Sequence, residues 1–283
     1  MSEAPHSADY IHDERFDWWS RDFLRLLKSR AIGDEIVTSL ADFGVGEGHW
    51  SLGLLDAFSD LRDVTGVDRE REWCERSAKK YSERAPHIAY RAVEADVSDT
   101  GMPGGSFDIV TAQTLLMHSL APEKIVAEMR RVAKRGGTIV CVEPVNHLNW
   151  AQTLELTNFL TPSERAAFYG VWVRFVDFVK VRRGDQDIGL RLPTLLARAG
   201  LENIRIWSND RVRLDPIETY DIDFLDDELR RDWVREALAG AAIGDAEIEF
   251  VRAIVARIRV EKPRELDFVP RASSSFVCVA TAP

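Results

Sequence analysis

Residues 36–48 have the sequence IVTSLADFGVGEG, in which an apolar run passes directly into three glycines at alternate positions. A short apolar run that ends at glycines is typical of a buried strand followed by a turn. The next residues, HWSLGLL at 49–55, have helical spacing, and a second strand-like segment, DVTGV at 63–67, ends on Asp68. The pattern predicts a strand, a glycine turn, a helix and a second parallel strand with an acidic residue at its tip.

This combination predicts a site for a nucleoside. Glycines let the backbone pass close to a bound molecule, with angles that a Cβ atom would forbid. The first turn of the helix presents N–H groups that have no partner inside the helix. An acidic side chain at the tip of the next parallel strand can accept both hydroxyls of a ribose. We therefore expect the glycine turn and Asp68 to lie together.

The spacing of the glycines helps to separate two classes of cofactor. A dinucleotide fold prefers G-x-G-x-x-G, and His49 stands where its third glycine would be. The order Asp42-x-Gly44-x-Gly46-x-Gly48 instead resembles the first motif of class I S-adenosylmethionine-dependent methyltransferases. In that family the glycine turn faces the methionine part of the cofactor, and the acid after the second strand holds the ribose. The resemblance implies S-adenosyl-L-methionine as the cofactor, with binding residues Asp42, Gly44, Gly46, Gly48, Asp68 and Arg69.

A third strand, predicted at 88–94, leads to Asp96 and Val97. In the family an acid at this point accepts a hydrogen bond from the adenine amino group, and the next backbone N–H group reaches a ring nitrogen. The resemblance therefore implies that Asp96 and Val97 bind the adenine. The alternative for Asp96 is a helix or turn cap, because Ser98 and Asp99 are nearby.

A fourth strand, predicted at 107–112, leads to Gln113. The family's first polar residue after this strand touches the methionine moiety, which implies that Gln113 binds the cofactor. His118 follows, and it is either a general base or, as in the family pattern, a brace for the next helix. That helix is predicted at 122–133, and Gly136-Gly137 then leads into a fifth strand.

A helix with many aromatic residues is predicted near the N-terminus, around residues 16–27. It either packs on the sheet edge or forms a lid over the cofactor. Many small-molecule methyltransferases begin with a Tyr followed by an Arg on an N-terminal helix, and Tyr10 with Arg21 resembles this pair. In those relatives the Arg meets the carboxylate of the cofactor, which implies the same role for Arg21. Arg15 and Arg25 are the alternatives.

The fifth strand, predicted at 138–143, ends at Glu143, and Asn146 and His147 follow. Ligands in open α/β sheets lie outside the carboxyl ends of the strands, so these residues are expected to border the pocket of the methyl acceptor. We predict Glu143 or His147 as a catalytic contact on the acceptor side. The aromatic residues of 148–182 are expected to form core on one face and substrate wall on the other.

The resemblance implies an α/β fold with a doubly wound, seven-stranded, mostly parallel sheet, the Rossmann-like methyltransferase fold, whose last strand is antiparallel. We predict an N-terminal helical lid at 1–30. The S-adenosylmethionine-binding methyltransferase domain is predicted at 31–283, with helical insertions at about 144–182 and 210–268. The N-terminal helix and the 144–182 insertion are expected to close together over the cofactor.

Composition limits the kinds of partner. The net charge of −10 and the pI near 5.2 argue against a surface for DNA or long RNA. Cys74, Cys141 and Cys278 show no metal-ligand spacing, and their odd number suits a reducing compartment. No signal peptide and no membrane-spanning apolar run are visible in the sequence. We expect a cytoplasmic monomer or homodimer with no bound metal, no nucleic acid partner and no membrane partner.

The resemblance implies an enzyme that moves a methyl group from S-adenosylmethionine to an oxygen or nitrogen atom of a small molecule. One alternative is a nicotinamide-dependent oxidoreductase, which would share the first strand, the turn and the acid. That alternative does not account for Asp96, Gln113 and the late Gly-Gly strand together. The other alternative is a catalytically silent cofactor-binding or scaffold protein with the same fold.

Overall fold

The computed structural model describes residues 13–148, 155–217, 229–261, 267–272 and 274–283. The chain forms two compact units. The sheet unit consists of the described residues of Met1–Pro144, Asp187–Arg211 and Ser275–Pro283. The inserted unit consists of the described residues of Val145–Gln186 and Val212–Ser274. The chain therefore leaves the sheet unit twice and returns to it twice.

Seven strands form the sheet of the first unit. They are β1 (Ser39–Phe43), β2 (Asp63–Asp68), β3 (Ala89–Glu94), β4 (Phe107–Gln113), β5 (Ala133–Pro144), β6 (Glu202–Ser208) and β9 (Ser275–Thr281). Their order across the sheet is β3-β2-β1-β4-β5-β9-β6. Neighbouring strands pair in parallel except at β9, which is antiparallel to both β5 and β6. The predicted fold class is confirmed.

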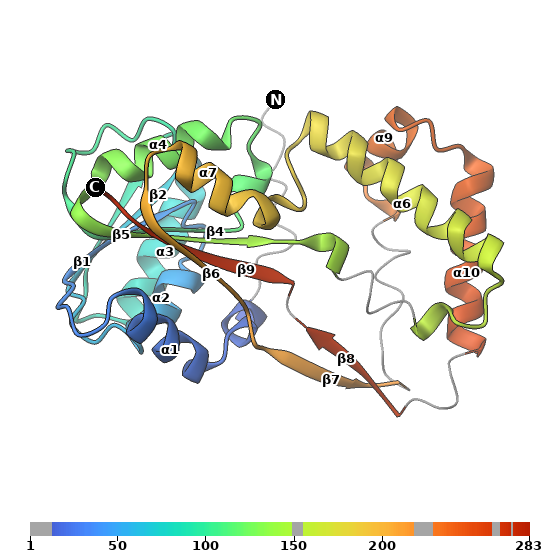
Figure 1. The fold of residues 1–283 in the computed structure, drawn as a ribbon, viewed down its shortest axis with the longest axis horizontal. Helices are drawn as coiled ribbons and strands as arrows, with labels where there is room; N and C mark the ends of the chain where they lie inside the picture. Colours follow the sequence, from blue (N-terminus) through green and yellow to red (C-terminus); the bar gives the residue numbers. More distant parts are fainter. Residues whose placement is uncertain (1–12, 149–154, 218–228, 262–266, 273) are drawn as a thin grey trace. The chain divides into compact units, whose positions relative to one another are not determined.

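Helices cover both faces of this sheet (Figure 1). One face carries α1 (Arg21–Ala31), α2 (His49–Leu55) and α3 (Arg71–Arg84), and the other carries α4 (Pro122–Val132) and α7 (Leu192–Arg198). Shorter 3-10 turns are η2 (Asp13–Trp18), η3 (Leu116–His118) and η5 (Ile188–Arg191). Alternate residues of each strand enter the two cores: Ile139 packs with α4 and α7, whereas Val140 packs with α1 and α2. Burial on both faces explains why the inner strands β1, β4 and β9 are mostly apolar, whereas the outer strands β3 and β6 are partly exposed and carry polar residues.

The inserted unit has its own apolar core. Its elements are η4 (Glu155–Thr157), α6 (Pro162–Arg182), β7 (Val212–Pro216), α9 (Asp232–Gly240), α10 (Asp245–Glu261) and β8 (Phe268–Ala272), with β7 and β8 antiparallel. A capping box between Thr161 and Glu164 begins α6. Helices α6 and α9 approach closely, since a Cβ atom on Gly240 would lie 2.2 Å from Cζ of Phe178. Within the described ranges no helix is long and apolar enough to cross a membrane.

The ends of the inserted segments lie close together. In the inserted unit, the backbone N–H of Asn146 donates to the carbonyl of Gln186 (3.3 Å), and their side-chain amides are also hydrogen-bonded (3.0 Å). The N–H of Val145 donates to the carbonyl of Ser274 (2.7 Å). In the sheet unit, the N–H of Asn209 donates to the carbonyl of Ser275 (3.0 Å). Each segment therefore begins close to where it ends.

The structure moves several predicted boundaries. The first strand begins at Ser39, not at Ile36, and the fifth begins at Ala133, not at Thr138. The fifth strand includes its two glycines because both are hydrogen-bonded to Ala282. The N–H of Gly136 donates to the carbonyl of Ala282 (2.8 Å), and the N–H of Ala282 donates to the carbonyl of Gly137 (2.9 Å). These hydrogen bonds keep the glycine pair in the ladder.

The region predicted as helical at 210–268 also contains the two strands β7 and β8. Residues 218–228 of this predicted insertion lie outside the described residues. The division into units also differs from the predicted boundaries, because η2 and α1 belong to the sheet unit. Trp19 and Phe23 are part of the core beneath α1 and α2.

Candidate functional site

The carboxyl ends of the central parallel strands are aligned by the register of the sheet. Phe43, the last residue of β1, lies opposite Val67 of β2 and Ala112 of β4. The glycine turn that follows β1 is therefore next to Asp68 on one side and to Gln113 on the other. The sheet brings these predicted site residues to one edge.

The glycine turn is held against the tip of β2. The N–H groups of Gly44 (2.8 Å) and Val45 (3.1 Å) both donate to the carbonyl of Val67. Gly44, Gly46 and Gly48 all have positive φ. A Cβ atom on Gly44 would lie 2.7 Å from Cδ1 of Leu115, so a side chain there would strain the backbone and displace Leu115.

The carboxylate of Asp68 joins the turn to the next helix. Its Oδ2 accepts from the N–H of Gly46 (3.1 Å), and its Oδ1 accepts from the N–H of Glu70 (3.1 Å). Burial raises the pKa of Asp68, and these two N–H groups and the charge of Arg69 oppose the rise. Arg69 itself is exposed and pairs with Glu70 (3.4 Å). The acid predicted for a ribose thus lies directly beside the glycine turn.

Asp42 lies behind the turn, with 2% of its surface exposed. Burial raises its pKa to about 7, the polar groups of Ser51 lower it, and the charge of Asp68 raises it further. Among the described residues, Asp42 Oδ2 and the hydroxyls of Ser51 and Tyr81 have no hydrogen-bond partner of ordinary geometry. Asp42 is therefore an interior residue of β1 and not an exposed group of the site.

Asp96 caps a turn, as predicted by the alternative to adenine binding. Its Oδ1 accepts from both the N–H and the hydroxyl of Ser98 (2.7 Å each). The side chain is exposed, and within the described part of the chain no donor is assigned to Oδ2. The turn is tied to the ribose side of the site because the N–H of Ala95 donates to the carbonyl of Asp68 (2.9 Å). Val97, half-buried, packs on the core beneath α4.

Glu143 organises the segment that follows β4. Its Oε1 accepts from the N–H groups of Leu115 (2.9 Å) and Leu116 (2.7 Å), and its Oε2 accepts from Met117 (3.2 Å). The side chain is completely buried, which raises its pKa to about 7 against the effect of the three N–H groups. Leu115 lies over Gly44, so Glu143 fixes the chain between Gln113 and the glycine turn. This position disfavours the predicted catalytic contact and favours a positioning role, which the sequence pattern did not indicate.

Gln113 and His118 flank this segment. Gln113 is the half-buried last residue of β4. Thr114 follows with positive φ, and its N–H donates to the carbonyl of Val142 (2.8 Å). His118 is an exposed residue of η3.

Arg21 does not lie at the glycine turn. Its side chain is 79% exposed and pairs with Asp56 (3.6 Å), the residue that follows α2. The turn precedes α2, and a helix of seven residues spans about 10 Å. Arg15, one of the predicted alternatives, is closer to the turn: burial lowers its pKa, and the charge of Glu47 within the turn raises it.

Glu47 belongs to a charged cluster that the sequence analysis missed. Its carboxylate pairs with Lys80 (2.6 Å) and Arg76 (3.3 Å) of α3. Burial raises the pKa of Glu47, but the hydrogen bond and charge of Lys80, with Arg76 and His49, lower it overall. Lys80 also lies 3.1 Å from Nε2 of His49. The spacing of Arg76 and Lys80, one helical turn apart, was the available signal.

The same cluster receives η2. The ring of Phe16 meets the His49 ring edge-on, with centroids 4.7 Å apart. The cations of Arg84 (4.4 Å) and Lys80 (5.7 Å) lie over the Phe16 ring. Phe16 thus joins the N-terminal element to the start of α2 and to α3. His147, the other predicted catalytic residue, is an exposed residue of the inserted unit.

Comparisons with known proteins agree with this geometry. Residues 41–141 match a family model described as a methyltransferase domain. Over 101 residues the chain is 34% identical to phosphatidylethanolamine N-methyltransferase of Cereibacter sphaeroides, covering 36% of this chain and 48% of that protein. Over 107 residues it is 33% identical to ubiquinone biosynthesis O-methyltransferase of Methylococcus capsulatus, covering 36% and 44%. It is 30% identical over 107 residues to demethylmenaquinone methyltransferase of Anoxybacillus flavithermus, covering 38% and 44%. The chain spans about half the length of these curated relatives.

Solved structures share the fold over nearly the whole chain. A candidate methyltransferase from Bacillus halodurans has a TM-score of 0.55 at 15% identity and covers 93% of this chain and 99% of its own. The YcgJ protein of Bacillus subtilis has a TM-score of 0.51 at 14% identity and covers 93% and 98%. The match over residues 41–141 and the shared fold support the predicted resemblance to class I S-adenosylmethionine-dependent methyltransferases.

Proposed function

We propose that this protein transfers a methyl group from S-adenosylmethionine to an oxygen or nitrogen atom of a small molecule. The observation that carries the proposal is the alignment of strand ends at one edge of the sheet. This alignment puts the glycine turn beside Asp68 and Gln113, and the hydrogen bond from Ala95 to Asp68 ties the Asp96 turn to the same edge.

The residues at this edge fit the cofactor. Each carboxylate oxygen of Asp68 accepts one backbone N–H, and a carboxylate oxygen has room for a second donor. Asp68 can therefore hold the two ribose hydroxyls without giving up the turn. Oδ2 of Asp96 is suited to accept from the adenine amino group. We assign the glycine turn and Gln113 to the methionine part.

The bound cofactor supplies a methyl group that its sulfonium already activates. The protein has to orient the cofactor, align the acceptor atom with the methyl group and exclude water, so proximity carries much of the rate. Glu143 acts at a distance by fixing residues 115–117, which follow Gln113 and Thr114. For the cofactor carboxylate we propose Arg15 ahead of Arg21, because Arg15 lies near Glu47 of the turn. We retain His147 as the proposed group on the acceptor side.

The acceptor is proposed to be a small molecule with an amine or hydroxyl group. The curated relatives are named for phosphatidylethanolamine, ubiquinone biosynthesis and demethylmenaquinone, and the net charge of −10 disfavours nucleic acid. We also propose a cytoplasmic monomer or homodimer. Cys141 and Cys278 lie opposite each other in the sheet as free thiols, which suits a reducing compartment.

Two measurements test the proposal. Calorimetry should detect binding of S-adenosylhomocysteine and of S-adenosylmethionine, and no binding of NAD or NADP. Transfer of a labelled methyl group is then measured on amines, phenols, phosphatidylethanolamine and demethylmenaquinone. Binding of nicotinamide dinucleotides alone would support the oxidoreductase alternative. Binding of S-adenosylmethionine with no transfer to any acceptor of this panel would favour the silent cofactor-binding protein.

A further inference from the structure

The connection between β3 and β4 spans residues 95–106 and contains no helix or strand. Loops longer than about 12–15 residues without their own secondary structure are uncommon in compact domains and are often functional, and this loop is close to that length. This loop begins with Asp96 and Val97, the residues assigned to the adenine. The conformation of the loop therefore determines where Oδ2 of Asp96 and the N–H of Val97 lie.

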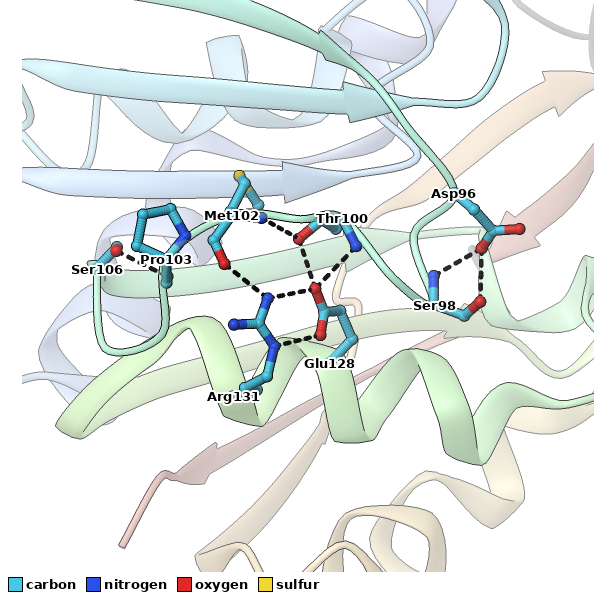
Figure 2. Close-up of polar contacts among 8 residues, drawn as sticks. All are labelled: Asp96, Ser98, Thr100, Met102, Pro103, Ser106, Glu128 and Arg131. Carbon is cyan, nitrogen blue, oxygen red and sulfur yellow. Dashed lines mark hydrogen bonds and ion pairs between the residues drawn. The ribbon is translucent and has the colours of Figure 1, made fainter.

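Two side chains of α4 hold the middle of this loop (Figure 2). Oε1 of Glu128 accepts from both the N–H (2.9 Å) and the hydroxyl of Thr100. The guanidinium of Arg131 donates to both oxygens of Glu128 (2.6 and 2.7 Å) and to the carbonyl of Met102 (2.7 Å). The hydroxyl of Thr100 also accepts from the N–H of Met102 (3.2 Å). The loop is thus attached to α4 at two residues through one ion pair.

The environment makes this attachment strong. Thr100, Met102 and Glu128 are each 6% exposed. The hydrogen bond from Arg131 lowers the pKa of Glu128 to about 2 against the effect of burial, so Glu128 is ionised at neutral pH. Hydrogen bonds to a charged group are stronger than hydrogen bonds between neutral groups. A buried carboxylate without these partners would be costly.

The end of the loop is also fixed by the backbone of α4. The N–H of Gly105 donates to the carbonyl of Arg131 (3.0 Å), and the N–H of Ser106 donates to Val132 (2.7 Å). The start is fixed by the hydrogen bond from Ala95 to Asp68. Between these ends, three hydrogen bonds join the loop to α4: two from Thr100 to Glu128 and one from Arg131 to the carbonyl of Met102. The ion pair between Glu128 and Arg131 lies within α4 and orients both side chains toward the loop.

We propose that Glu128 and Arg131 are positioning residues for adenine recognition, which they control by fixing Thr100 and Met102 behind the Asp96 turn. This inference rests on the proposed function, because it assigns the Asp96 turn to the base of the cofactor. The pair touches no ligand itself. Its effect is to keep Oδ2 of Asp96 and the N–H of Val97 in place before the cofactor arrives, which lowers the cost of binding.

The test uses the whole protein and two ligands that differ in one group of the base. S-adenosylhomocysteine has an adenine amino group, whereas S-inosylhomocysteine has an oxygen there, which Asp96 would repel. Calorimetry gives the Kd of each ligand, and their ratio reports recognition of the base. In the unaltered protein we expect S-adenosylhomocysteine to bind at least tenfold more tightly.

Two variants loosen the loop without removing the buried charge of Glu128. Thr100→Val removes the hydroxyl but keeps its N–H and its shape, and Arg131→Lys keeps the charge but cannot bridge Glu128 and Met102 with one planar fork. Both are expected to raise the Kd of S-adenosylhomocysteine about tenfold and to move the ratio toward one. Thr100→Ser keeps the hydroxyl, so the Kd of S-adenosylhomocysteine and the ratio of the two Kd values should match those of the unaltered protein. Arg130→Ala is the matched control on α4, since Arg130 donates to Ala199 and not to the loop (2.8 Å).

Each outcome decides the inference. A folded Thr100→Val or Arg131→Lys protein that keeps both the Kd and the ratio would overturn it and leave the proposed function intact. A raised Kd with an unchanged ratio would also overturn it, because general loosening, not recognition of the base, would be the cause. An unaltered protein that binds both ligands equally would remove the assigned role of Asp96. If the unaltered protein binds neither ligand, the proposed function fails with the inference.

Discussion

Asp68 joins two parts of the site through a single carboxylate. One oxygen holds Gly46 and the other holds Glu70, and both are proposed to accept the ribose hydroxyls as well. Asp68→Ala is expected to raise the Kd of S-adenosylhomocysteine tenfold to a hundredfold, because a charge-assisted hydrogen bond contributes about 1.5–3 kcal/mol. Calorimetry measures this change. Asp63→Ala, an exposed residue at the other end of β2, is the control and should bind normally; equal Kd values for both variants would refute the ribose assignment.

The raised pKa of Asp42 leads to a prediction of how the free energy of unfolding depends on pH. Its pKa is raised to about 7 in the folded protein from 3.8, so the protonated form is favoured by folding. The stability from this group is fully present below pH 4 and is lost as the pH rises through about 7. Asp42→Asn removes this titration. Relative to the variant, the unaltered protein should lose about 2–4 kcal/mol between pH 4 and pH 8.

Urea unfolding at several pH values measures this difference. Glu143 has a pKa of about 7 as well, and it is present in both proteins, so its contribution cancels in the comparison. Parallel stability curves for the two proteins would show that Asp42 does not titrate in this range.

At the scale of elements, the Phe16 ring joins η2 to His49 at the start of α2 and to two cations of α3. Phe16→Ala removes the contacts with His49, Arg84 and Lys80, which we expect to weaken docking of η2 by about 1–3 kcal/mol. Limited proteolysis should then cut before α1 earlier than in the unaltered protein. S-adenosylhomocysteine should restore protection only in part. Leu26→Ala, an exposed residue of α1, is the control, and identical cleavage rates for both variants would show that Phe16 does not hold the segment.

The strands and the glycine turn could be predicted because their signals are local. Short apolar runs mark β1, β2 and β4, and the turn after β1 needs residues that tolerate positive φ. The role of Glu143 could not be predicted, because three N–H groups converge on it from a segment after a different strand. Arg21 was predicted by resemblance alone, and the side chain that lies near the turn is Arg15. A sequence does not show which of several arginines on one face reaches a given point.

At the scale of the whole molecule, the two inserted segments share one core. Residues of α6 pack with residues of α9 and α10, so neither segment is complete without the other. This explains why the sequence suggested two separate insertions: α6 and the later helices are far apart along the chain. Pairing of β7 with β8 is equally non-local, and its strands have no local turn between them.

The neighbouring ends of these segments lead to a prediction. Replacing both 145–186 and 212–274 by short glycine-serine loops should leave a sheet unit that folds, because the chain ends to be joined are already close. We expect this shortened protein to bind S-adenosylhomocysteine and to transfer no methyl group. Calorimetry and the transfer assay measure the two properties. Replacing only 212–274 is the control and should aggregate, because it exposes the apolar face of α6; a well-behaved single replacement would show that the two segments do not depend on each other.

The place of β9 in the sheet has a consequence for how the protein is made. This strand is formed by residues 275–281, yet it lies between β5 and β6 and is the partner that joins β6 to the sheet. During synthesis, β6 emerges from the ribosome long before β9, and both its edge and that of β5 stay open in the meantime. Open strand edges are sites of aggregation. We therefore expect the nascent chain to be prone to aggregation until residues 275–281 leave the exit tunnel and pair with β5 and β6.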